Sequence, residues 1–210
     1  VSGSGRDVLP VAAVPILEEE GVEFKYHTGP DGVLEYTAVV PGLPFKERVK
    51  FMKKHKDLFP EVPPRIMKSM GEAIGQYGMI KEGDKVMLGL SGGKDSLTML
   101  HCLLALQRRS PVKFELACVT VDPQTTGFDP SPLRDYCKTI GVKYFYESRA
   151  VIALAKKKLK NGSICSWCSR MKRGILYSTL RREGYNVLVL AQHLDDLAES
   201  FLMSVFHNGI

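Results

Sequence analysis

A run of small and polar residues at Ser91–Ser96 (Ser-Gly-Gly-Lys-Asp-Ser) separates an apolar stretch from a helical segment. The apolar stretch, Lys85–Leu90, has the length and composition of a buried parallel strand, and Asp95–Arg109 is predicted to be helical. The two glycines let the backbone turn tightly, and the start of the helix offers unpaired N–H groups to an anion. A strand, a glycine-rich turn and a helix in this order favour an α/β fold with an anion-binding loop.

Strand-like and helical segments alternate along the chain from Arg65 onward. After the first strand we expect further strands at Phe114–Val121, Val142–Glu147 and Val187–Ala191. We expect helices at residues 65–77, 95–109, 130–140, 151–160, 171–183 and 195–207. Strands that alternate with helices of this length predict an α/β fold built on a doubly wound parallel sheet.

The N-terminal part of the chain has a different pattern. Two strand-like runs within Val22–Val40 flank the hairpin-turn signal Gly29–Gly32. The stretch Phe45–Phe59 is basic and helix-like, and a proline pair breaks the pattern after it. We therefore divide the chain into an N-terminal extension without an assigned role, residues 1–64, and an α/β domain, residues 65–210.

The overall composition excludes several classes of protein. Apolar residues make up 44% of the chain, as in ordinary globular proteins. The sequence has no run of 18 or more apolar residues, the length needed to span a membrane. Five cysteines, an odd number, without a visible secretion signal favour a reducing compartment. We expect a cytoplasmic protein without a membrane partner, and an organellar location stays open. Because the chain starts at Val1 and stops at Asn208–Ile210, directly after a helical pattern, we expect a fragment whose α/β domain is truncated at its C-terminus.

Positive charge is concentrated in one part of the chain. The net charge is +6, and the segment from Arg149 to Arg182 holds ten Lys or Arg and no Asp or Glu. Such a one-signed stretch attracts polyanions. The plainer alternative is a solvated helix face.

The side chains of the glycine-rich loop suit a polyphosphate. Ser91 and Ser96 supply hydroxyl groups and Lys94 supplies a positive charge. The spacing does not match a Walker A loop, and no dinucleotide-binding glycine pattern is present. A carboxylate at Asp95 would repel phosphate unless a divalent cation lay between them, so Asp95 indicates Mg²⁺ bound with the polyphosphate. The alternative is an ordinary strand-to-helix turn made of small residues.

The loop resembles that of the PP-loop ATP pyrophosphatase superfamily. Enzymes of that superfamily cleave ATP between the α and β phosphates and adenylate an oxygen of their substrate. A nucleophile then displaces AMP. The resemblance implies ATP as cofactor.

Two further motifs carry chemistry. Asp195 and Asp196 lie at another predicted strand end and helix start, where they could hold Mg²⁺ or simply cap the helix. Cys165 and Cys168 form a Cys-x-x-Cys pair in a predicted loop, which suits a metal, an iron–sulfur cluster or a redox disulfide. Basic neighbours and a following helix start favour the thiolate form.

The combination of motifs resembles the tRNA 2-thiocytidine synthetase family, the tRNA-cytidine(32) 2-sulfurtransferases. The motifs are Gly83–Lys85 leading into Ser91–Ser96, then Pro123–Phe128, Cys165–Gly174 and Asp195–Asp196. In that family a PP-loop domain adenylates O2 of cytidine 32 in tRNA. A [4Fe-4S] cluster held by three cysteines then delivers sulfur, and AMP leaves.

The resemblance assigns roles to particular residues. The residues that it implies for binding of ATP and Mg²⁺ are Ser91, Gly92, Gly93, Lys94, Ser96, Val121, Asp122, Asp195 and Asp196. Those that it implies for catalysis are Asp95, Cys165 and Cys168, the two cysteines as cluster ligands. Those that it implies for contact with the tRNA backbone are Arg170, Lys172 and Arg173.

The sequence departs from the family in two respects. The third cluster cysteine of the family lies after the region where this chain ends, and none of Cys102, Cys118 or Cys137 matches it by motif. The first sixty residues have no counterpart in the family. Two alternatives stay open: thiolation of a tRNA uridine by a sister family, and a non-catalytic nucleotide- or tRNA-binding module. The partners implied are tRNA and a sulfur donor such as a cysteine desulfurase, and a homodimer stays open.

Overall fold

The computed structural model describes residues 21–28, 34–124, 128–152, 155 and 164–208. Its strands are β1 (Glu23–Thr28), β2 (Leu34–Val40), β3 (Lys85–Gly89), β4 (Glu115–Asp122), β5 (Lys143–Ser148) and β6 (Val187–Val189). Its helices are α2 (Phe45–Lys54), the short 3-10 helix η2 (Lys56–Leu58), α3 (Pro64–Tyr77), α4 (Lys94–Arg109), α5 (Ser131–Thr139), α7 (Ile164–Arg182) and α8 (Leu194–Asn208). Within these residues, no helix combines the length and the apolar character needed to cross a membrane.

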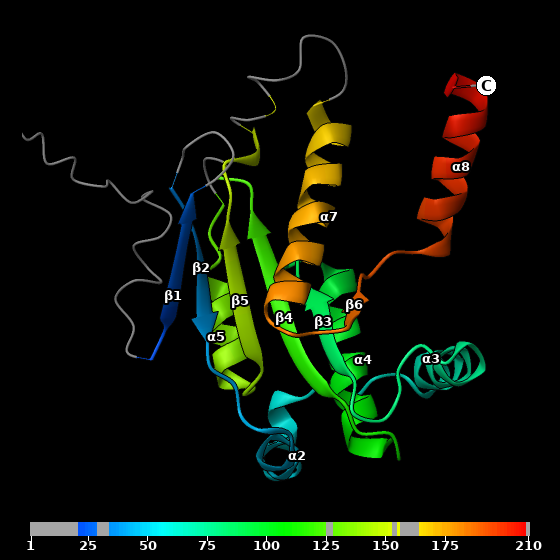
Figure 1. Cartoon of the computed structure of the whole chain (residues 1–210). Helices are drawn as coiled ribbons and strands as arrows, with labels where there is room; N and C mark the ends of the chain where they lie inside the picture. The colour runs from blue at the N-terminus through cyan, green and yellow to red at the C-terminus, as the bar shows by residue number, and fades with distance from the viewer. Residues whose placement is uncertain (1–20, 29–33, 125–127, 153–154, 156–163, 209–210) are drawn as a thin grey trace, which may run out of the picture.

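The strands form one six-stranded sheet in the order β1-β2-β5-β4-β3-β6 (Figure 1). The four strands β5, β4, β3 and β6 run parallel, which confirms the predicted α/β fold with a parallel core. The strands β1 and β2 form an antiparallel pair, and β2 pairs antiparallel with β5. The N-terminal extension therefore lengthens the sheet of the α/β domain at one edge.

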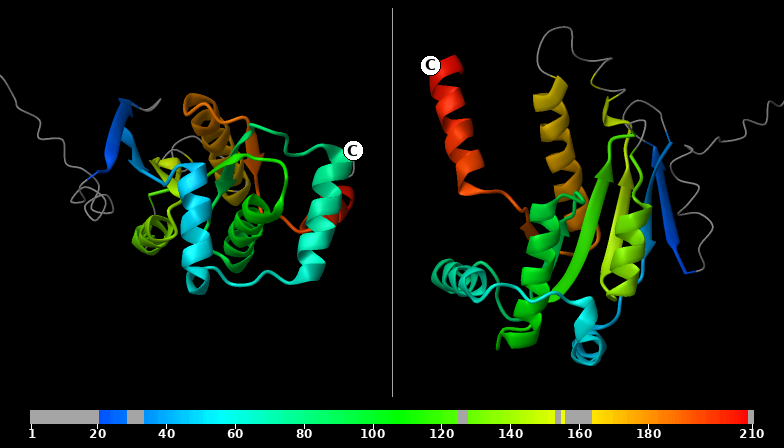
Figure 2. Two further views of the ribbon diagram at one scale, coloured as in Figure 1. Left: turned by 90° about the horizontal axis from the view of Figure 1, so that it is seen from below. Right: turned by 180° about the vertical axis from the view of Figure 1, so that it is seen from behind.

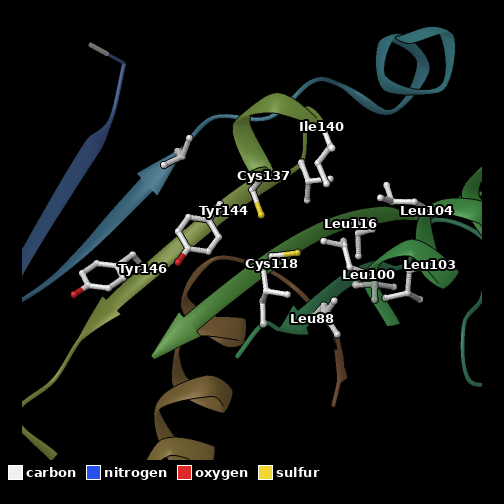
Figure 3. Close-up of a cluster of buried hydrophobic side chains, with 14 of the residues drawn as sticks. Leu88, Leu100, Leu103, Leu104, Leu116, Cys118, Cys137, Ile140, Tyr144 and Tyr146 are labelled. Carbon is white, nitrogen blue, oxygen red and sulfur yellow. The ribbon is translucent and has the colours of Figure 1, made fainter. Parts of the chain in front are cut away.

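Helices cover both faces of the sheet, as expected for a doubly wound fold. Figure 1 and Figure 2 show α4 and α5 on one face and α7 on the other. On the first face, Leu100 and Leu103 of α4 and Cys137 of α5 pack against Leu88 and Cys118 of the strands (Figure 3). This apolar core holds β3 in place and so fixes the start of the loop that follows it.

The segment before Met171 differs from the prediction. Cys165 and Cys168 lie in helix α7, which begins at Ile164, and not in a loop. Residues 164–173 contain neither glycine nor proline, so nothing in this stretch prevents the helix from starting early. The four strands expected in the α/β domain are confirmed to within two residues at each end. The turn signal at Gly29–Gly32 and all of the helix expected at 151–160 except residues 151, 152 and 155 lie outside the described residues.

A buried charged cluster joins the N-terminal hairpin to the α/β domain. The fully buried carboxylate of Glu147 in β5 accepts hydrogen bonds from Thr37 of β2 at 2.9 Å and from Arg149 at 2.8 Å. It also forms an ion pair with Arg182 of α7. Arg149 forms a second ion pair, at 2.6 Å, with Glu35 of β2. Side chains from β2, β5 and α7 therefore hold one another through shared charges.

Candidate functional site

The loop Ser91–Ser96 follows β3 and ends in the first turn of α4. Its backbone turns at Gly92, whose φ of +84° lies in the left-handed region. The hydroxyl of Ser96 donates a hydrogen bond to the carbonyl of Gly93 at 2.9 Å and accepts one from the backbone N–H of Ser91 at 3.3 Å. The hydroxyls of Ser91 and Ser96 lie 3.1 Å apart. The loop thus has internal bonds that hold it in a defined shape.

Two adjoining cavities lie beside this loop. The loop cavity has a volume of about 290 Å³. It is lined by Gly89, Ser91, Gly93, Asp95, Ser96, Ser169, Lys172, Arg173, Leu176, Leu190, Ala191 and Gln192. The strand cavity has a volume of about 230 Å³. It is lined by Gly89, Leu90, Ser91, Val119, Thr120, Val121, Phe128, Lys172, Leu176 and Leu190. Both lie at the carboxyl ends of parallel strands, where open α/β sheets bind ligands.

Asp95 lies on the wall of the loop cavity. Its carboxylate forms an ion pair with Lys94 Nζ at 2.8 Å and lies 3.1 Å from His193 Nε2. Hydrogen bonds from the Lys94 and His193 side chains hold the pKa of the Asp95 carboxyl below its usual value. The carboxylate is therefore ionised at neutral pH and available to a cation. The hydrogen bond that Lys94 donates to Asp95 likewise raises the pKa of Lys94.

The second carboxylate pair lies at the start of α8. The Asp196 carboxylate accepts a hydrogen bond from the backbone N–H of His193 at 3.1 Å, which caps the helix. Asp196 is also close enough to raise the pKa of Lys94 electrostatically. His193 therefore links this helix start to Asp95.

Val121 and Asp122 occupy different environments. Val121, which is predicted to lie near the adenosine, lines the strand cavity. Asp122 is 1% exposed, and its carboxylate accepts hydrogen bonds from the backbone N–H of Gln124 at 2.7 Å and from the hydroxyl of Tyr146. The carboxylate of Asp122 is thus engaged in holding the segment after β4, and Asp122 does not line either cavity.

The basic residues of α7 divide between cavity and solvent. Lys172 and Arg173 line the loop cavity, whereas Arg170 is exposed and lines neither cavity. Ser169 and Leu176 lie on the same side of the helix, at the i, i+3, i+4, i+7 spacing of one helical face. Neither residue was predicted as part of the site, although this spacing could have indicated both. Two cations therefore face the glycine-rich loop across the cavity.

The described cysteines fall into two groups. Cys102, Cys118 and Cys137 are buried free thiols of the core. Cys168 is a half-buried free thiol next to Ser169 of the cavity wall, and the side chain of Cys165 lies outside the described part of the structure. Cys165 and Cys168 are three positions apart on α7. Among the described residues, no group of three or more metal-binding side chains comes together.

Gly92 offers a test of the loop conformation. An alanine at Gly92 would have to adopt a left-handed φ of +84°, which costs about 1–2 kcal/mol. Gly93 has an ordinary φ of −73°, and a Cβ there would lie 3.5 Å from the Ser91 hydroxyl oxygen. We expect Gly92→Ala to lower the free energy of unfolding in urea by about that amount and Gly93→Ala to change it little. Equal losses in the two variants would show that backbone strain is not the cause.

The site belongs to a known type of domain. A family model for the PP-loop domain matches residues 64–209. The chain belongs to the PP-loop domain family. The match contains the loop Ser91–Ser96, both cavities and the whole of α7 and α8.

The chain is also similar to individual curated proteins. The chain is 39% identical over 156 residues to a tRNA-cytidine(32) 2-sulfurtransferase of Cupriavidus necator, covering 74% of this chain and 50% of the relative. It is 40% identical over 158 residues to the protein of that name from Pasteurella multocida, covering 75% and 50%. The chain thus spans about half the length of the curated relatives it matches.

A solved structure shares the fold. The U34-tRNA thiolase NcsA from Methanococcus maripaludis, solved with its [4Fe-4S] cluster, aligns with a TM-score of 0.54 and 22% identity. The alignment covers 78% of this chain and 50% of that one. At this identity the likeness concerns the fold.

Proposed function

We propose that the chain is the nucleotide-binding part of an ATP-dependent tRNA thiolation enzyme that converts cytidine 32 to 2-thiocytidine. The observation that carries this proposal is the loop cavity, where Lys172 and Arg173 face a PP-loop across a space of about 290 Å³. The proposed target base is the one that the relatives at 39% and 40% identity are named for. The protein would release AMP and pyrophosphate.

ATP would occupy both cavities. The triphosphate lies in the loop cavity, where backbone N–H groups at the start of α4 and the cations of α7 stabilise negative charge. The adenosine lies in the strand cavity against the apolar side chains of Val119, Val121 and Phe128. Thr120 donates its hydroxyl to the carbonyl of Leu90 at 2.7 Å, which keeps this wall in place.

Mg²⁺ fits the residues of this site. Asp95 supplies an ionised oxygen ligand on the cavity wall, and the remaining ligands would come from phosphate oxygens and water, as Mg²⁺ prefers. The ion would offset charge on the leaving pyrophosphate. Asp195 and Asp196 are further proposed ligands at the start of α8. His193 keeps Asp95 oriented through its contact at 3.1 Å.

The sulfur-bearing end of the site would lie at the start of α7. Cys165 and Cys168 are the proposed ligands for a [4Fe-4S] cluster, which when bound would carry the sulfur to be transferred. Cys168 adjoins Ser169, so a group held there would lie beside the nucleotide cavity. Arg170 is exposed and free to contact tRNA phosphate. A sulfur donor such as a cysteine desulfurase, a homodimeric assembly and a cytoplasmic location complete the proposal.

Nucleoside mass spectrometry of tRNA tests this function. We expect tRNA from cells that lack the gene to lose 2-thiocytidine and to keep 2-thiouridine. Loss of a 2-thiouridine would keep the adenylation chemistry and move the substrate to the uridine class. No change in either nucleoside, together with no tRNA-dependent release of AMP by the complete protein, would favour a non-catalytic binding module.

A further inference from the structure

A second polar cavity lies at the opposite end of the sheet from the PP-loop. Its volume is about 190 Å³. It is lined by Gly42, Leu43, Pro44, Phe45, Arg48, Glu115, Leu116, Lys143 and Tyr185. Glu115 and Lys143 are the first residues of β4 and β5, so the cavity lies at the amino ends of these strands, beneath which Figure 1 shows α2. It is therefore separate from the proposed nucleotide site.

Arg48 of α2 is the central feature of this cavity. Arg48 is 3% exposed, and its Nε atom has no hydrogen-bond partner. Its Nη1 atom donates only long hydrogen bonds, of 3.4 Å each, to the carbonyls of Leu43 and Leu116. Arginine keeps its charge in proteins, and a buried charge that lacks a counter-ion is costly. The arginine thus needs an anion that the cavity has room to hold.

The charged neighbours of Arg48 do not supply that anion within the described structure. Glu115 lines the cavity and favours the charged form of Arg48 electrostatically, but its side chain is 59% exposed and its carboxylate lies 4.0 Å from Lys85 Nζ. Lys143 adds a second positive charge to the wall, and its Nζ lies 5.0 Å from the ring centre of Phe145. Tyr185 lines the cavity as a neutral phenol, since burial raises its pKa to about 12. The two cations outnumber the single carboxylate.

Helix α2 adds further attraction for an anion. Its N-terminus lies at the cavity through Pro44 and Phe45, and no side chain caps it. The first N–H groups of a helix have no intrahelical partners and carry partial positive charge. Five lysines of α2 and η2 are also exposed around this end of the molecule: Lys46, Lys50, Lys53, Lys54 and Lys56. Their field raises the local concentration of anions.

We propose that the cavity beneath α2 binds a phosphate-class oxyanion, with Arg48 as its central cation and Lys143 as the second. Arg48 presents planar N–H donors that match phosphate oxygens. A single water needs only about 10–15 Å³, so a cavity of about 190 Å³ has room for a phosphate group. The phosphate would come either free from solution or from an RNA backbone.

Thermal unfolding in inorganic phosphate, compared with sodium chloride at equal ionic strength, tests this site. At ten times the Kd, phosphate bound here should raise Tm by about 3–6 °C. We expect Arg48→Met and Lys143→Met each to lose the increase in Tm that phosphate bound in this cavity causes. Lys50→Met, which removes an exposed cation of the same helix, should respond as wild type. Phosphate bound at the PP-loop raises Tm in all four proteins and cancels in the comparison.

The fold should tolerate these substitutions. Methionine in place of Arg48 removes a buried charge and keeps an unbranched side chain, and such exchanges are often neutral or stabilising. Should Arg48→Met fail to fold, the half-buried Lys143 still provides the comparison. Equal phosphate responses in wild type, Arg48→Met and Lys143→Met would overturn the proposal.

A second arm separates the two sources of phosphate. A short RNA oligonucleotide without terminal phosphates replaces inorganic phosphate in the same four proteins. If the RNA raises Tm in wild type but not in Arg48→Met, the site binds an RNA backbone. If only inorganic phosphate gives an increase in Tm that depends on Arg48, the site binds a free ion. Absence of an Arg48-dependent response in both arms means that water alone fills the cavity and refutes the proposal.

Discussion

Replacing Asp95 by asparagine is expected to lower ATP-dependent thiolation of tRNA by about 10²–10³-fold, the loss typical when one group that stabilises transition-state charge is removed. The substitution keeps the size of the side chain and removes its negative charge. Asp95 is the carboxylate on the wall of the loop cavity, opposite Lys172 and Arg173. Without it the Mg²⁺–ATP complex would lose a ligand, and the activity should need more Mg²⁺ to recover.

Asp135→Asn is the matched control. Asp135 lies in α5 and, like Asp95, forms an ion pair with the cation one position before it, Arg134, at 2.8 Å. It lines neither cavity beside the PP-loop. Release of AMP and formation of the thiolated nucleoside should fall in Asp95→Asn and stay unchanged in Asp135→Asn, with similar Tm values for both. Normal turnover and normal Mg²⁺ dependence in Asp95→Asn would remove Asp95 from the mechanism.

The loop and its neighbours were predictable because their signals are local. Ser91–Ser96 lies between a strand and a helix, and each of these elements is recognisable from a few consecutive residues. Parallel strands bring their carboxyl ends together, so Val121 and the start of α8 could be expected near the loop before the structure was known. The family relationship added the type of ligand.

The basic residues of α7 show what a local sequence pattern cannot predict. The basic run indicated a polyanion partner, and Arg170, Lys172 and Arg173 were assigned to tRNA. The structure separates them, because only Lys172 and Arg173 lie on the face that lines the loop cavity. Which face of α7 packs on the sheet depends on Leu176 and Leu180, whose partners lie on strands far away in the sequence. A count of charges carries no such information.

Asp122 illustrates a second limit. Its position after β4 is that of a ligand-binding residue, but its carboxylate is occupied by Gln124 and Tyr146. Tyr146 belongs to β5, so the competing hydrogen bond exists only once the two strands have paired. The buried contacts of the N-terminal hairpin are equally non-local, since Thr37 and Glu147 are 110 positions apart. Sequence patterns therefore left the extension without a role.

Among the side chains that join the N-terminal hairpin to the α/β domain, Glu147 should contribute most to stability. Its fully buried carboxylate is shared by Thr37, Arg149 and Arg182. Glu147→Gln would leave both arginines without this counter-ion, and breaking a buried ion pair from one side costs about 3–5 kcal/mol. We expect a loss of that size in the free energy of unfolding, measured in urea from the shift of the midpoint at constant slope.

Lys25→Met provides the comparison, because its partner Glu183 also pairs with Arg182 of the buried cluster. Lys25 of β1 pairs with Glu183 at 2.9 Å, but its side chain is 41% exposed, and pairs of this kind contribute only about 0–1 kcal/mol. A loss in Glu147→Gln no larger than that in Lys25→Met would mean that water reaches the buried charges. If the large loss is observed in one unfolding transition, the hairpin and the α/β domain unfold together. The extension would then stabilise α7, and with it the cations Lys172 and Arg173 that face the PP-loop, from the far edge of the sheet.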